Sequence, residues 1–412
     1  MKSRLSLIWF GLLLTFALPL DLAAQEAPSQ ELRTLQARFT VGGIQPDCLQ
    51  RPASSLPGHG LAPLGGTHPC KPVLAGTEAT QLSNELPRHD DHGTYITFDV
   101  PGSSSTSVSG INLTGTIAGS YCDAVGCHGF LRRLNGAFTT FDVPGSSSTS
   151  VSGINLTGTT AGSYCDTAGC HGFLRTLNGA FTTFDVPGTF DGPYVTAIND
   201  AGVITGAYFD ENFVSHSFLR SPNGTITTFD APGAVYGTIS WGINLEGATT
   251  GFYFDEDFVD HGFVRSRSGD ITTFDILGLG TDAYATSLLG TVTGQFNEDH
   301  PEVHFHLWRG FIRKVDGTIE TFDAVPSPLD PCCTWTTPSS INLFGEIVGT
   351  DNDAHGVNHG FLRARDENIT ILDAPGSGPI GTIAVSINQL GVIAGYYYDV
   401  NNVTHGFLWI RH

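Results

Sequence analysis

The sequence predicts an all-β protein, a seven-bladed β-propeller that is closed by pairing of its N-terminal repeat strand with its C-terminal strands. Three observations predict it: a long internal repeat, four short strand patterns in each copy, and complementary half-copies at the two ends. The repeat is clearest in Phe141–Arg175, which matches Phe98–Arg132, 43 residues earlier, almost letter for letter.

Seven copies of the repeat follow one another to the C-terminus, each marked by a Phe-Asp pair, an Ile-Asn pair, a Gly-x-Tyr-x-Asp run and a His-Gly-Phe-Leu motif. The fifth copy departs most from this pattern, since Ser287–Leu288 replaces Ile-Asn and Arg309 replaces the His. The Phe-Asp pairs, with one Leu-Asp variant, begin at Phe98, Phe141, Phe184, Phe229, Phe274, Phe322 and Leu372.

Each motif predicts one short strand, because threonine and aromatic residues alternate with polar ones there. Asn-Gly or Asp-Gly pairs such as Asn135–Gly136 separate the third and fourth strands and predict a type I′ hairpin, in which both residues take positive φ. No stretch after the N-terminus has a sustained helical period.

The two ends of the repeat region favour a closed ring. The first copy opens with a lone strand, Thr94–Asp99, and the last copy ends with a lone strand, His405–Trp409, so each lacks the partner that the other supplies. Pairing them would hide two sheet edges. An open β-solenoid is the alternative architecture, but it would not explain why each end of the repeat region carries one unpaired strand.

We divide the chain into residues 1–24, a signal peptide, residues 25–91, a Pro/Gly-rich arm, and residues 92–412, the propeller. Lys2 and Arg4 precede the apolar run Leu5–Leu20, as in a secretory signal. A membrane anchor is the alternative, although the run is short for a span. We therefore expect a secreted monomer, extracellular or periplasmic, with no membrane span after cleavage.

Export allows disulfides, and the eight cysteines are even in number. Cys122–Cys127 and Cys165–Cys170 flank the loop between the second and third strands in successive copies, so each pair is expected to bridge a hairpin; metal binding is the alternative. Cys48–Cys70 is a possible pair in the arm, and the adjacent Cys332 and Cys333 bond to each other or elsewhere.

The formal net charge of −21 argues against a nucleic-acid partner and against anionic lipid, because both need a basic surface. An acidic surface suits solubility outside the cell, or divalent cations.

The signal peptide together with INLTGTIAG at Ile111–Gly119 and HGFL at His128–Leu131 and His405–Leu408 resembles the bacterial HAF-family extracellular repeat proteins. The resemblance covers residues 94–412 and implies a secreted repeat protein. It implies no catalytic residues, and the fifth copy departs from both motifs.

Residue types present in every copy are expected to serve the fold, so the repeated His and Asp are interpreted as structural hydrogen-bonding partners. Function is then expected where the symmetry breaks. Two insertions do so, Asn297–Trp308 in the loop between the second and third strands, and Ala324–Trp335 in the next loop between blades. Both are predicted on one rim, where they would be neighbours.

The first insertion suggests a metal site. Alternate residues of an extended segment point to one side, so His300, Glu302, His304 and His306 are candidate ligands of a divalent metal, the cofactor being otherwise unknown. A solvated polar loop is the alternative. Asp255–Asp257 and Asp351–Asp353 are weaker candidates for Ca²⁺.

No P-loop, Rossmann or nucleophile-elbow motif is present. The leading expectation is therefore a secreted, non-catalytic binding or structural module for a glycan, protein or cell-envelope partner. The alternative is an extracellular metal-assisted lyase or hydrolase with its site on the long-loop rim.

Overall fold

The computed structural model describes residues 93–412 except 278–279, 301–304, 326–334 and 354. The predicted signal peptide, the arm with Cys48 and Cys70, and Cys332 and Cys333 lie outside these residues. Among the described residues no helix is long and apolar enough to span a membrane.

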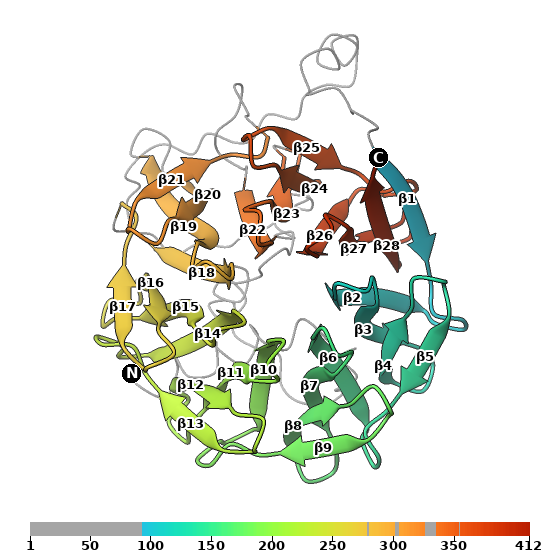
Figure 1. Cartoon of the computed structure of the whole chain (residues 1–412), viewed down its shortest axis with the longest axis horizontal. Helices are drawn as coiled ribbons and strands as arrows, with labels where there is room; N and C mark the ends of the chain where they lie inside the picture. The colour runs from blue at the N-terminus through green and yellow to red at the C-terminus, as the bar shows by residue number, and fades with distance from the viewer. Residues whose placement is uncertain (1–92, 278–279, 301–304, 326–334, 354) are drawn as a thin grey trace, which may run out of the picture.

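The regular secondary structure of the described residues consists of strands alone. They form four-stranded antiparallel units arranged around a centre, and this arrangement is a β-propeller (Figure 1). Hydrogen bonding groups the 28 strands into five sheets of four or eight strands. Each eight-stranded sheet consists of two four-stranded units that share one parallel pair, Ser215↔Gly237 in one and Trp308↔Trp335 in the other.

Each unit has an inner, a second, a third and an outer strand. The inner strands are β2 Ser105–Ile111, β6 Ser148–Ile154, β10 Pro193–Ile198, β14 Gly237–Ile243, β18 Thr281–Thr286, β22 Trp335–Ile341 and β26 Thr382–Ile387. The second strands are β3 Ile117–Cys122, β7 Thr160–Cys165, β11 Ile204–Phe209, β15 Thr249–Phe254, β19 Val292–His300, β23 Ile347–Asn352 and β27 Ile393–Tyr398.

The third strands are β4 Cys127–Arg132, β8 Cys170–Arg175, β12 Ser215–Arg220, β16 Asp260–Arg265, β20 Phe305–Arg313, β24 Asn358–Arg363 and β28 Thr404–Arg411. The outer strands are β1 Gly93–Phe98, β5 Phe138–Phe141, β9 Phe181–Phe184, β13 Ile226–Phe229, β17 Ile271–Phe274, β21 Ile319–Phe322 and β25 Ile369–Leu372.

The predicted closure is present. Strand β1 pairs antiparallel with β28, from Gly93↔Arg411 to Phe98↔Gly406, so the two ends of the described chain share one unit (Figure 1). The Asp99 carboxylate also accepts a hydrogen bond from His405 Nδ1 at 2.9 Å. A chain that closes in this way leaves fewer exposed sheet edges.

The third and outer strands are joined by a different turn from the one predicted. Of the Asn135–Gly136 pair only Gly136 has a positive φ, +87°, and Gly136 N–H donates to Arg133 O. This is a type I turn followed by a left-handed glycine, not the type I′ turn, because the loop holds more residues than the Asn-Gly pair alone.

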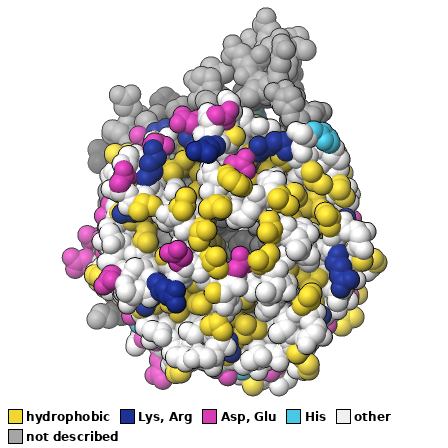
Figure 2. All heavy atoms as spheres, in the orientation of Figure 1, with side chains coloured by type: hydrophobic (Ala, Val, Ile, Leu, Met, Phe, Trp, Pro, Cys, Tyr) yellow, Lys and Arg dark blue, Asp and Glu magenta, His cyan; other side chains and the backbone are white. Residues whose placement is uncertain are grey.

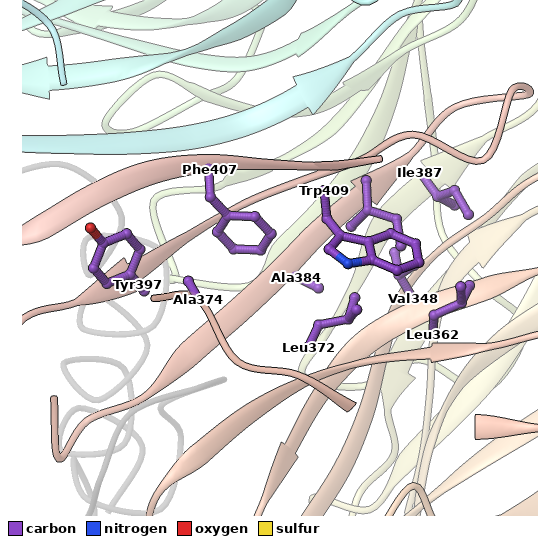
Figure 3. Close-up of a cluster of buried hydrophobic side chains, with 10 residues drawn as sticks. Val348, Leu362, Leu372, Ala374, Ala384, Ile387, Tyr397, Phe407 and Trp409 are labelled. Atoms are coloured by element: carbon purple, nitrogen blue, oxygen red, sulfur yellow. The ribbon is translucent and has the colours of Figure 1, made fainter. Parts of the chain in front are cut away.

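The core lies between neighbouring units, where the Phe of each His-Gly-Phe motif is fully buried, as at Phe130 and Phe407. In most units the Arg that ends the third strand covers the Phe of the preceding outer strand, as Arg132 covers Phe98 at 4.6 Å. In the last unit, Trp409 and Leu372 stand at these two positions and pack in one apolar cluster (Figure 3).

A ring of side-chain amides ties the units together at the end where the inner strands finish. Asn112 Nδ2 donates to Asn155 O, and each following Asn bonds in the same way to the next copy. Asn388 donates to Asn112 O across the closure. Ser287 stands in the fifth copy, and no bond from its side chain to Asn342 O is found in the described residues.

Candidate functional site

The inner strands surround a cavity of about 550 Å³ at the centre of the ring. Figure 2 shows the hollow, edged mostly by hydrophobic and uncharged side chains. Serine and threonine hydroxyls line it together with Tyr194, Trp241, Tyr284, Trp335 and Tyr396, and Asp191 is the one carboxylate among its described lining residues. Such a cavity suits a polar but largely uncharged ligand.

The repeated His side chains lie away from this cavity, in the third strands, and are held by carboxylates. His128 Nδ1 donates to Asp142 at 2.9 Å, and its Nε2 lies 3.3 Å from Asp123. Although burial opposes it, these carboxylates raise the pKa of His128. The same arrangement recurs at His171, His261 and His359, so the repeated His and Asp form structural ion pairs, as expected.

The fifth copy replaces this His with an arginine and keeps the ion pair. Arg309 donates to both carboxylate oxygens of Asp323, at 2.8 and 2.9 Å, and to Glu298 at 2.8 Å. A guanidinium matches a carboxylate in this two-pronged geometry. The unusual residue at this position therefore preserves the fold and is not itself a sign of function.

The described residues of the first insertion extend the two strands that flank it. Strands β19 and β20 have nine residues each, whereas β3 and β4 have six, and they pair as far as His300↔Phe305 and Asp299↔His306. His300 and His306 thus belong to two paired strands and not to one extended segment. Glu302 and His304 lie outside the described residues, and the metal site predicted for these four residues stays a prediction.

The two insertions meet, as predicted. Trp308, at the end of the first, pairs with Trp335, at the end of the second. Trp335 also lines the cavity at the long-loop end of β22. The same parallel pair joins Ser215 to Gly237 in another sheet, so the pairing belongs to the repeat, and this junction differs by carrying two tryptophans at the mouth of the cavity.

The second strand of the sixth copy, β23, carries Asp351, which is 1% exposed and is not among the residues that line the cavity. It stands where other copies have the Tyr that stacks on the repeated His, for example Tyr397 on His405. Burial raises the pKa of Asp351 to about 7, although Thr336 Oγ1 donates to its Oδ1 at 2.5 Å. A carboxyl with its pKa near neutral can both donate and accept a proton there.

The repeat provides a second group of unusual residues near β18. The Tyr284 hydroxyl donates to Asp282 Oδ2 at 2.9 Å, and Gln295 Nε2 donates to the same oxygen at 3.1 Å. Gln295 Oε1 in turn accepts from Thr337 Oγ1 at 2.8 Å. Burial raises the pKa of Asp282 to about 6 and the pKa of Asp260, on the adjacent strand β16, well above its usual range.

Sequence reasoning missed this group, although a signal existed. When the copies are aligned by strand register, Asp282 is equivalent to Ser107 and Ser150 of the first two copies, and Gln295 is equivalent to Ser120. Two polar residues that change together in one copy would have marked the position. The carboxylates singled out for Ca²⁺ are used otherwise, since Asp255 and Asp353 each accept backbone N–H groups of their own turn.

The predicted hairpin disulfides are both present. Cys122–Cys127 and Cys165–Cys170 join the ends of paired strands, with Cα atoms 4.1 and 4.0 Å apart. Two such bonds are compatible with an extracellular or periplasmic protein. Cys165 and Cys170 also border the cavity.

Comparison with known proteins defines the class. No protein-family model and no curated protein matches the chain. The structure is similar to virginiamycin B lyase from Staphylococcus aureus, with a TM-score of 0.52 and 14% identity over 77% of this chain and 99% of that one. It is also similar to a streptogramin B lyase, with a TM-score of 0.51 and 16% identity over 77% and 97%.

At these identities the similarity shows the fold alone, and it confirms the β-propeller. It also corrects the leading functional expectation. The two solved structures just named are lyases, so the expectation of a non-catalytic binding or structural module is corrected in favour of the alternative, an extracellular lyase or hydrolase.

Proposed function

We propose that the protein is an extracellular lyase or hydrolase that acts on a substrate bound at the long-loop mouth of the central cavity. The observation that carries the proposal is Trp335, at the end of the second insertion, which lines the central cavity and pairs with Trp308 of the first insertion. Long segments on a rigid scaffold are the usual place for binding and catalysis.

The proposed substrate is polar and uncharged. The described lining offers hydroxyls and aromatic faces but a single carboxylate, Asp191, and no lysine or arginine. An anionic substrate would lack a counter-charge there, whereas hydroxyl and amide groups would find hydrogen-bonding partners.

Asp351 is the proposed acid–base residue. Elimination and hydrolysis both need a group that accepts one proton and returns it to the leaving group. Asp351 lies between the lining residues Thr350 and Asn352 along β23, with its buried side chain on the other face of the strand. A metal held by His300, Glu302, His304 and His306 remains part of the same proposal, as a group that would polarise the bond to be broken.

The proposal includes the finer assignment of the fold and family. Seven copies that each supply four strands make seven blades, and the 28 described strands support this number. Export is proposed with it, and the two disulfides are compatible with export. The HAF-type repeat and a monomeric state are part of the same proposal.

The test is a substrate screen with the exported protein. Streptogramin B antibiotics, other cyclic esters and neutral polysaccharides are incubated with the wild type, Trp335→Ala and Asp351→Asn, with Glu256→Gln as an exposed control. A lyase product gains a double bond that absorbs ultraviolet light, and a hydrolase product gains the mass of water.

Asp351→Asn is expected to slow turnover by about 10²- to 10⁴-fold, and Trp335→Ala to raise KM. Absence of any product across the panel, or turnover that both variants leave unchanged, would contradict the proposal.

A further inference from the structure

We infer that the junction between β16 and β18 is a binding site for a hard divalent cation, with Ca²⁺ as its expected occupant and Asp260, Asp282 and Asn297 as its ligands. The inference concerns these residues alone and holds or fails independently of the proposed enzymatic activity.

The first argument is the orientation of Asp282. This side chain is 6% exposed, and two donors, the Tyr284 hydroxyl and Gln295 Nε2, hold its Oδ2. Its Oδ1 is buried and has no hydrogen-bonding partner among the described residues. Donors on one oxygen orient a carboxylate and leave the other oxygen to a metal, which is a common arrangement around metal ligands.

The second argument is that further oxygen atoms lie close by. A Cβ placed on Gly280 would lie 3.6 Å from Asp260 Oδ2 and 3.5 Å from Asn297 Cβ. The Asn297 backbone N–H donates to Gly280 O at 2.9 Å, whereas its side-chain Oδ1 is buried and also has no partner in the described part of the chain. The absence of a side chain at Gly280 thus leaves space between these groups.

The third argument is the cost of the bare arrangement. The Asp282 carboxyl is 6% exposed, and Asp260, on the neighbouring strand β16, is partly exposed. Buried carboxylates that are not paired are strongly unfavourable, and proteins place them beside a cation or an opposite charge. No arginine or lysine is paired with either of them in the described residues, so a cation is the missing partner.

The chemistry of the donors selects the ion. All three ligands offer oxygen, from two carboxylates and one amide, with no imidazole or thiolate among them. Oxygen-only sets suit Ca²⁺ and Mg²⁺ and disfavour the transition metals that histidine binds. The ion therefore differs in kind from the one that His300 and its neighbours would bind.

The repeat itself supplies matched variants. By strand register, Asp282 is equivalent to Ser107 of the first copy, and Asp260 is equivalent to Ser215 of the third copy. Serine is therefore already accommodated at both positions in this fold. Asp282→Ser and Asp260→Ser are expected to fold and to lose the cation. Asp257→Asn, in an exposed turn, is the control.

The experiment is calorimetric titration of the chelator-treated full-length protein with CaCl₂. The wild type and the control are expected to bind one ion, and both serine variants to bind at least about 100-fold more weakly, as for lost metal ligands. Thermal unfolding with and without Ca²⁺ is the second measurement, since an ion that binds only the folded state raises Tm, by an amount that grows with the logarithm of its concentration over its Kd.

No binding of Ca²⁺ by the wild type, or equal binding by both serine variants, would overturn the inference. Replacing His300, Glu302, His304 and His306 together by Ala should leave Ca²⁺ binding intact. Loss of Ca²⁺ in that variant would assign the ion to the insertion and refute the site described above.

Discussion

Asp351→Asn should change how stability depends on pH, and the direction follows from the raised pKa. The carboxyl titrates near 3.8 in the unfolded chain and at about 7 in the folded protein. The folded state therefore holds its proton more tightly, and the free energy of unfolding falls as pH rises from about 4 to 7 and is then constant. A shift of about 3 pKa units corresponds to about 4 kcal/mol.

Neighbouring groups act outside most of this window. The pKa of Asp353 is lowered to about 2, despite its burial, by His359 and by backbone N–H groups, so its stabilisation is present above 3.8 and is lost toward pH 2. The pKa of His359 is raised to about 10 by Asp353 and Asp373 although burial opposes it. Its stabilisation is complete below 6.5 and is lost as pH rises through 10.

The assay is urea unfolding of the wild type, Asp351→Asn and the exposed control Glu256→Gln at several pH values between 4 and 6.5. The wild type should lose stability relative to Asp351→Asn as pH rises, while the control follows the wild type. Contributions from Asp282 are common to all three proteins and cancel. Equal pH slopes for wild type and Asp351→Asn would refute the reasoning.

Two further predictions concern stability. Trp409→Arg should destabilise the protein by about 3 kcal/mol and Leu372→Phe by about 1 kcal/mol. The double variant recreates the Arg–Phe pair of the other units and should recover about 1 kcal/mol. A double-mutant cycle in urea with a coupling energy of zero would contradict this. Reduction of Cys165–Cys170 should lower stability by about 2 kcal/mol, because the loop that it closes is short. Thermal unfolding of the wild type and of Cys165→Ser/Cys170→Ser without reductant measures it, since a reductant would also break Cys122–Cys127.

The sequence was sufficient for the architecture because each copy repeats the same local signals. The phase of Thr94–Asp99 against His405–Trp409 predicted the closure, which depends only on strand order. The turn at Asn135–Gly136 was predicted wrongly, because its type depends on how many residues separate the last paired positions, and a dipeptide does not specify that number.

The candidate site was predictable only in part. The meeting of Trp308 and Trp335 followed from ring order. The cavity, the burial of Asp351 and the bonds of Asp282 did not follow from it, because they depend on which inner-strand side chains face the centre and how closely neighbouring units pack. Those distances are set by tertiary packing and carry no periodic signal in the sequence.

The ring of asparagines gives a final test of whether function occupies one arc of the propeller. The ring is interrupted between the fifth and sixth copies, at the end of the inner strands opposite to the long loops, because the side chain of Ser287 makes no bond to Asn342 O among the described residues. Ser287 Oγ accepts the Thr291 N–H at 3.1 Å, the bond that Asn Oδ1 makes in other copies. An Asn at this position would keep that bond and add the missing donor.

Ser287→Asn is therefore expected to stabilise the protein by about 1 kcal/mol, the usual net value of one buried hydrogen bond. Urea unfolding measures it, and Asn199→Ser, which removes the same bond from a regular copy, should have the opposite sign. If the junction between the fifth and sixth copies needs to move during turnover, the stabilised variant should also show a lower kcat, since natural proteins often have reduced stability near their functional sites. A destabilised Ser287→Asn protein would instead mean that the junction is spaced too widely, or packed too tightly, for the amide to complete the ring.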